Sequence, residues 1–382
     1  MQIAGLEIGL PRNETEVGPE WLTKALHASG ALGAGGRVSL VATTRIGEGV
    51  GLLSRLFRLR LTYEGDAAGA PSAVVLKLPT DDPNMRFLAN SLNAYGREIK
   101  FYREIAAGSP FGSAQCHAAM IDQESGDFVL VMEDLAHLRN FDQVNGCSWE
   151  EAEAVCDVLA NFHAQWHGHR DLPALSETFW CMKNPVYPTL LPSMFSASWP
   201  VAKRVLGGEL SADMLRFGDH WNTLSSYFFD QLADTQTLVH GDFRADNLFQ
   251  GDGKITALDF QIASQGPGIY DLAYFVSQSI TPQVRGGRDK DLVARYLARM
   301  ASLGIELDEA ETWRMYQLCL AYCLIYPMAV FQSWDVTNER GQELMRSLLM
   351  RCASAIEDTG ALATFPAEAW VSAADNLDRR TT

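Results

Sequence analysis

A short polar loop between two strand-like segments constrains the fold of this sequence most. The loop reads HGDFRADN from His240 to Asn247 and follows the short strand signal Thr-Leu-Val. Twelve residues after Asn247, the sequence Ala-Leu-Asp-Phe-Gln places Asp259 at the end of a second short strand signal. An Asp after one strand, an Asn five residues later and an Asp closing the next strand are expected to gather their oxygens around one cleft.

This set of oxygen groups suits the transfer of a phosphoryl group. Such a reaction depends on positioning and charge neutralisation, so it uses one carboxylate to orient the attacking hydroxyl and other oxygens to hold magnesium on the phosphates. Taken singly, each residue has an ordinary explanation, because Asp and Asn are common in turns. Their joint spacing between two strand signals favours the catalytic interpretation.

The residues before this loop predict a lobe built on a sheet, over 1–135. Runs rich in Val, Leu and Thr, separated by turns with Gly, predict antiparallel strands, and the spacing of apolar residues predicts helices. The strands are expected at 38–46, 55–63, 73–78, 115–121 and 128–132, and the helices at 20–28 and 84–107.

The second lobe, over 136–382, is predicted to be mostly helical and to carry the catalytic loop and the acceptor site. Ser148 and Glu151 have the spacing of a capping box, which starts a helix that reaches about His167. Further helices are expected at about 210–232, 287–302, 308–326 and 338–357. The fold class is therefore α+β, with two lobes.

Composition excludes several functions. The net charge of −16 argues against nucleic-acid partners, which require clustered Lys and Arg. The apolar stretch 318–330 is too short to span a bilayer. The N-terminal residues lack a basic start followed by a long apolar run, so we expect no signal peptide there. Seven cysteines without a Cys-x-x-Cys pair do not indicate a disulfide framework, so we expect a reducing cytoplasm.

The motifs HGDFRADNLF and LDFQ, with the downstream Tyr-Asp-Leu-Ala at 270–273, resemble the aminoglycoside phosphotransferase and choline kinase superfamily. The Asp-Phe-Gln form and the segment Arg97–Tyr102 are most similar to its ecdysteroid-kinase-like branch. The resemblance implies a bilobal protein-kinase-like fold. It also implies that the chain uses ATP and Mg2+ to phosphorylate a hydroxyl of a small molecule.

The resemblance also implies roles for single residues of the loop and its surroundings. Asp242 would be the catalytic base, and Asn247 and Asp259 would ligate magnesium. Asp271 would brace the catalytic loop from the following helix, and His240 would hold the loop rather than take part in the chemistry.

In the first lobe, Lys77 lies in an apolar strand, so its ammonium group needs a partner unless it reaches the edge of the lobe. Glu98 on the next helix is the expected partner, although Glu104 lies on the same helix. A kinase-like lobe uses such a Lys to hold nucleotide phosphates and such a Glu to orient it.

Two further segments of the first lobe are candidates for nucleotide binding. Gly47, Gly49 and Gly51 permit the close backbone approach of a phosphate-covering loop, although an ordinary hairpin turn has the same composition. The resemblance implies that the backbone of Glu133 and Leu135, where the lobes join, contacts the adenine. A simple linker is an equally compatible interpretation of that segment.

Two other functions remain as alternatives to the small-molecule kinase. A protein kinase is disfavoured, because the chain lacks an Ala-Pro-Glu sequence and carries Gln261 where a Gly is expected. A catalytically silent nucleotide-binding module would not need Asp242. The acceptor stays open among antibiotic-, choline- and steroid-like compounds, because the family that the sequence resembles has diverse substrates. The aromatic residues between Trp166 and Trp199 suit a pocket for a bulky apolar alcohol, and core packing explains them at least as well.

Overall fold

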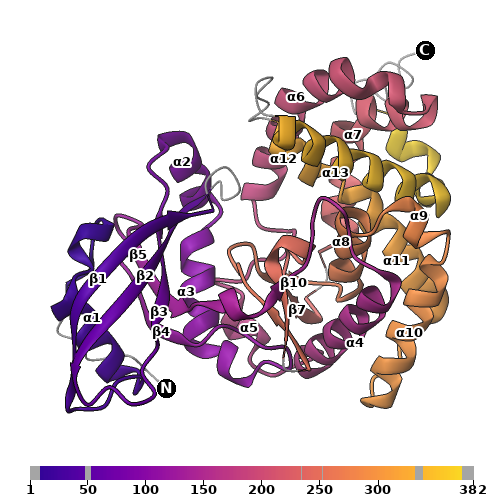
Figure 1. Ribbon diagram of the computed structural model, residues 1–382. Helices are drawn as coiled ribbons and strands as arrows, with labels where there is room; N and C mark the ends of the chain where they lie inside the picture. Colours follow the sequence, from indigo (N-terminus) through magenta and orange to yellow (C-terminus); the bar gives the residue numbers. More distant parts are fainter. Residues whose placement is uncertain (1–8, 48–52, 234, 252, 332–338, 372–382) are drawn as a thin grey trace. The chain divides into compact units, whose positions relative to one another are not determined.

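The computed structural model describes residues 9–47, 53–233, 235–251, 253–331 and 339–371 (Figure 1). The chain divides into two compact units. The first unit contains the residues up to Arg139 together with Phe249–Ile262, and the second contains Asn140–Leu248 and the residues from Ala263 onward. The predicted boundary after Leu135 lies four residues before Arg139, after which the chain first enters the second unit. The segment Phe249–Ile262, predicted within the second lobe, belongs to the first unit.

The first unit is built on one sheet of five strands in the order β1-β2-β3-β5-β4, with antiparallel neighbours throughout (Figure 1). This confirms the predicted five-stranded antiparallel sheet. Its strands are β1 (Gly36–Ile46), β2 (Ser54–Gly65), β3 (Ala73–Pro79), β4 (Cys116–Ile121) and β5 (Phe128–Glu133).

Helices pack on both faces of this sheet. The apolar residues of α1 (Pro19–Ala28), among them Leu22, share one core with Leu76 of β3. Successive side chains of a strand point to opposite faces. Lys77 therefore points away from α1, toward Glu98 on α3 (Ala94–Glu104).

The prediction of one continuous helix over 84–107 is wrong. The structure has two helices there, α2 (Pro83–Ser91) and α3, with a break at Asn93. Asn93 has a φ of 51°, in the left-handed region that Asn adopts more readily than most residues and that a right-handed helix excludes. Apolar periodicity continues across this break, which is why the pattern predicted a single helix.

The second unit is mostly helical. Its helices are α4 (Trp149–Trp166), α5 (Leu172–Leu175), α6 (Val186–Leu206), α7 (Ala212–Gln231), α8 (Ile269–Ser279), α9 (Pro282–Arg285), α10 (Asp289–Ser302), α11 (Glu309–Tyr322), α12 (Ile325–Phe331) and α13 (Glu339–Asp358). The capping box of Ser148 and Glu151 is confirmed at the start of α4. No described helix combines the length and the apolar character needed to cross a membrane.

Helix α8 lies at the centre of the second unit and positions the candidate site. All eleven of its residues are buried, and it packs against α4, α11 and α13. The polar loop 240–247 leaves β7 (Thr237–Val239), which pairs with β10 (Ser264–Gly266) just before α8. The remaining short strands are β6 (Arg139–Asn140), β8 (Leu248–Gly251) and β9 (Lys254–Ala257).

Candidate functional site

The carboxylate of Asp271 fixes the start of the polar loop from within α8. It accepts hydrogen bonds from the backbone N–H groups of His240 at 2.7 Å and Gly241 at 2.9 Å, and its Oδ2 lies 3.1 Å from Nε2 of His163. Gly241 has a φ of +87°, which strongly favours glycine. Asp271 and His163 are fully buried, so these contacts satisfy a carboxylate that burial would otherwise penalise heavily.

His240 also contributes to the loop, because its Nδ1 accepts a hydrogen bond from the backbone N–H of Asp242 at 3.2 Å. The imidazole is fully buried and meets the ring of Phe243 edge to face. These contacts are those expected of residues that hold a loop. The supporting roles of His240 and Asp271 in a reaction stay predictions.

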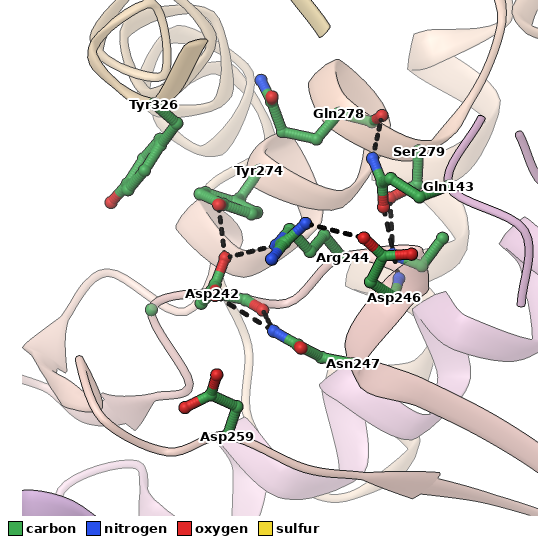
Figure 2. A network of polar contacts seen from close by, with 12 residues as sticks. Gln143, Asp242, Arg244, Asp246, Asn247, Asp259, Tyr274, Gln278, Ser279 and Tyr326 are labelled. Carbon is green, nitrogen blue, oxygen red and sulfur yellow. Dashed lines mark hydrogen bonds and ion pairs between the residues drawn. The ribbon is translucent and has the colours of Figure 1, made fainter. Parts of the chain in front are cut away.

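The side chain of Asp242 is held from three directions (Figure 2). Its Oδ1 accepts from the hydroxyl of Tyr274 and from Nε of Arg244 at 3.1 Å, and its Oδ2 accepts from Nδ2 of Asn247 at 3.0 Å. The side chain nevertheless remains 19% exposed. Asp242 is thus an immobilised carboxylate that still reaches the surface.

Only one of the two orientations of the Asn247 side-chain amide forms hydrogen bonds with its neighbours. Its Nδ2 donates to both the backbone oxygen and Oδ2 of Asp242, at 2.9 and 3.0 Å. The reversed amide would place its oxygen against two other oxygens. Oδ1 of Asn247 therefore points away from Asp242, and within the described residues it has no hydrogen-bond donor. An amide oxygen of this kind is a suitable ligand for a hard cation.

The rest of the loop is tied to two other segments of the second unit (Figure 2). The backbone N–H of Ala245 donates to the hydroxyl of Ser279 at 2.9 Å, and that of Asp246 donates to Oε1 of Gln143 at 3.3 Å. The Gln143 amide in turn donates to the backbone oxygen of Gln278 at 2.7 Å. The loop is therefore supported along its length by residues at the end of α8 and by a residue about a hundred positions earlier.

The predicted nucleotide-binding residues of the first unit form a separate cluster around Lys77. Its Nζ lies 2.8 Å from Oε1 of Glu98 and 3.1 Å from Oδ1 of Asp259. Glu104 instead pairs with Lys100 on the surface. Asp259 has a φ of 68°, uncommon for a residue other than glycine, and its side chain stays 33% exposed. The predicted pairing of Lys77 with Glu98 is therefore present.

Burial shifts the titration of this cluster. Burial by itself would lower the pKa of Lys77, but the charges of Asp259 and Glu98 outweigh it and raise the pKa. Burial is also the main reason that the pKa of Glu98 rises to about 7, although Lys77 acts in the opposite direction. The ammonium thus stays charged at neutral pH, whereas Glu98 takes up a proton near neutral pH.

Glu98 is expected to give the protein a measurable dependence of stability on pH. Its pKa is about 7 in the folded protein and 4.5 ordinarily, so between these values the folded protein holds a proton that the unfolded chain releases. This contribution is complete below pH 4.5 and is lost as the pH rises through 7. Glu98→Gln should therefore gain stability relative to the parent over this range, by at most about 3 kcal/mol.

Urea unfolding of the parent and Glu98→Gln at pH 5, 6 and 7.5 measures this difference. Glu104→Gln, at an exposed position on the same helix, is the matched control and should give the same pH dependence as the parent. Parallel curves for the parent and Glu98→Gln would contradict the raised pKa.

The other predicted nucleotide contacts are only partly described. Gly47 has a φ of +67°, and Gly49 and Gly51 lie outside the described residues. The backbone N–H of Glu133 donates to the oxygen of Gln115 at 2.8 Å. The oxygen of Leu135 accepts from the N–H of Leu138 at 2.9 Å. The roles of these residues in binding adenine or phosphate stay predictions.

The predicted site residues thus fall into two groups, with Asp242, Asn247, Asp271 and His240 in the second unit and Lys77, Glu98 and Asp259 in the first. Sequence reasoning missed several residues that hold the carboxylate and the loop, among them Tyr274, Arg244, Gln143 and Ser279. The helical spacing of Asp271 and Tyr274, three residues apart, is the signal that could have identified Tyr274.

Comparisons with solved structures identify the fold. A candidate aminoglycoside phosphotransferase from Ralstonia eutropha matches with a TM-score of 0.51 at 14% identity, over 88% of this chain and 98% of that one. A mutant aminoglycoside 2′-phosphotransferase-IIIa, solved with GDP, matches with a TM-score of 0.51 at 13% identity, over 85% and 94% of the two chains. These matches confirm the predicted bilobal, kinase-like α+β fold.

Sequence comparisons identify the family. A segment of 120 residues is 31% identical to acyl-CoA dehydrogenase family member 10 of Mus musculus, but it covers 28% of this chain and only 11% of that protein. The model of the ecdysteroid kinase-like family matches residues 48–308, which include both groups of predicted site residues. The resemblance seen in the motifs is thereby confirmed, and the chain belongs to the ecdysteroid kinase-like family.

Proposed function

We propose that this protein transfers the γ-phosphoryl group of ATP to a hydroxyl of a small molecule. The observation that carries the proposal is the carboxylate of Asp242, which is held by three side chains and still reaches the surface. A binding module has no need for such a group, whereas a kinase uses it to orient the acceptor hydroxyl. Membership of the ecdysteroid kinase-like family supports the same reaction.

The residues present suit a magnesium nucleotide. Asn247 offers an amide oxygen without a donor among the described residues, and Asp259 offers a carboxylate that is one third exposed. In this proposal these two residues hold Mg2+, which neutralises charge on the phosphates when bound. Lys77, kept charged by its acidic neighbours, contacts the phosphates. The backbone of Glu133 and Leu135 holds the base.

In the proposed step, Asp242 accepts a hydrogen bond from the acceptor hydroxyl and aims its oxygen at the γ-phosphorus. The new oxygen–phosphorus bond forms as the bond between the γ-phosphorus and the bridging oxygen breaks, which leaves ADP. The hydroxyl proton passes to Asp242 and then to solvent. Asp242 thus needs a fixed orientation more than a high basicity, because the leaving bond is largely broken before the hydroxyl loses its proton.

A mass-spectrometric screen tests the proposal. The purified protein is incubated with Mg2+ and either ATP or GTP against aminoglycosides, amino alcohols and steroid alcohols, in parallel with Asp242→Asn. A product heavier by one phosphoryl group, absent with the variant, would establish the reaction and the acceptor class. Binding of nucleotide without product from any compound would favour the silent module, and the absence of both would refute the proposal.

A further inference from the structure

One face of α8 contacts the first three residues of the candidate catalytic loop, His240–Asp242. Asp271 and Tyr274 are three residues apart, so they lie on the same side of the helix. Asp271 bonds the backbone at the start of the loop, and the hydroxyl of Tyr274 bonds the side chain of Asp242 (Figure 2). A single buried helix therefore orients both the backbone of the loop and the carboxylate that the loop presents.

We propose that Tyr274 is a positioning residue, whose hydroxyl fixes the Asp242 carboxylate so that Oδ2 faces the acceptor hydroxyl. The inference rests on the proposed function. It assigns to Tyr274 a task that differs from the bracing of the backbone by Asp271, because it concerns the orientation of the reacting oxygens themselves.

Counting the acceptor positions of the carboxylate leads to Oδ2. An ionised carboxylate has about four lone-pair sites, two on each oxygen. Oδ1 accepts from Tyr274 and from Arg244, so both of its sites are used. Oδ2 accepts only from Asn247 within the described residues, so one of its sites remains for the acceptor hydroxyl.

Tyr274 is better suited than Arg244 to set this orientation. Arg244 lies on the loop itself, is 20% exposed, and divides its guanidinium between Asp242 and Asp246. Tyr274 comes from outside the loop, is only 3% exposed, and packs with its ring 4.3 Å from that of Tyr326, nearly perpendicular to it. A buried aromatic side chain has two χ angles and little freedom to follow the carboxylate if it moves.

The protonation state of Tyr274 fits a permanent donor. Burial, followed by the negative charge of Asp242, raises the pKa of Tyr274 well above its ordinary value. The phenol therefore keeps its proton across the range in which the protein is folded, and the geometry of Asp242 does not depend on the ionisation of its neighbour.

Tyr274→Phe tests the role, because it removes one oxygen and leaves the ring in place. We expect kcat to fall roughly 10- to 100-fold, as for a misplaced catalytic group, with the KM values for nucleotide and acceptor within about twofold of the parent. Tyr322→Phe is the matched control, because Tyr322 is also buried but its hydroxyl lies against the sulfur of Met182 and the side chain of Tyr326 rather than against the loop. That variant should keep the parental kcat.

Kinetics with the acceptor found in the screen, together with thermal melting of both variants, separate the possible outcomes. A lower kcat with unchanged KM values and a melting temperature equal to that of Tyr322→Phe would support the positioning role. Parental kcat in Tyr274→Phe would overturn it and leave the proposed function standing. A parent protein that transfers no phosphoryl group would overturn the proposed function, and this inference with it.

Discussion

Asp242→Asn should lower kcat roughly 10²- to 10⁴-fold, the range associated with the loss of a positioned acid–base group. The substitution keeps the shape of the side chain, and the amide oxygen can still accept from Tyr274. The amide nitrogen, however, would face Nδ2 of Asn247, which now donates to Oδ2 at 3.0 Å. The variant thus loses both the charge and the free acceptor site that a substrate hydroxyl would use.

The measurement is steady-state kinetics with the acceptor identified in the screen. Asp230→Asn, at an exposed position in α7, is the matched control and should behave as the parent. Nucleotide affinity, measured by calorimetry, should change far less than kcat in Asp242→Asn, because this carboxylate is expected to contact the acceptor rather than ATP. Parental turnover in Asp242→Asn would refute its assignment as the catalytic base.

Lys77→Met should affect both stability and catalysis. The Lys77 side chain is 6% exposed and pairs with Glu98, which is fully buried, so its removal leaves a buried carboxylate without its cation. Breaking a buried pair in this way costs roughly 3–5 kcal/mol. Loss of the charge that we assign to the phosphates should also lower kcat/KM for ATP by roughly 100-fold or more.

Lys100→Met is the control for this variant, since Lys100 lies on the same helix as Glu98 and forms an exposed pair with Glu104. A surface pair of this kind contributes about 0–1 kcal/mol, so its removal should hardly change the urea midpoint. The loss of stability in Lys77→Met should be smaller at pH 6 than at pH 8, because protonation of Glu98 relieves the unpaired charge. Equal midpoints for the two variants would contradict the buried pair.

The sequence predicted the sheet more reliably than the helices. Strand signals were local, and the apolar run of β3 with Lys77 as its one charged residue can be recognised from the pattern alone. The helix α6 was missed because it contains Pro192 and Pro200, which usually exclude a helix interior. The break at Asn93 was missed because it depends on a left-handed backbone conformation that apolar periodicity does not reveal.

The residues of the candidate site also differ in how far the sequence could identify them. Asp242 and Asn247 are five residues apart, so a motif within one loop was enough to identify them. The pairing of Lys77 with Asp259 spans 182 residues, and the bond from Asp246 to Gln143 spans 103. Tyr274 lies 32 residues beyond Asp242. Contacts at such separations depend on the tertiary fold, and the sequence alone carried no signal for most of them.

The segment Phe249–Ile262 lies in the sequence between two stretches of the second unit but belongs to the first unit. This affects any attempt to cut the protein into two fragments. A fragment that ends at Arg139 would contain all five strands of the large sheet, yet it would lack Asp259 and the ring of Phe260 that stacks on Phe101. The complementary fragment would carry Phe260 without the rings of Phe101, Tyr102 and Phe111 that it packs against. No single cut therefore yields two intact units. The chain passes from one unit to the other three times, after Arg139, Leu248 and Ile262, so gene fusions and truncations should keep all three passages intact.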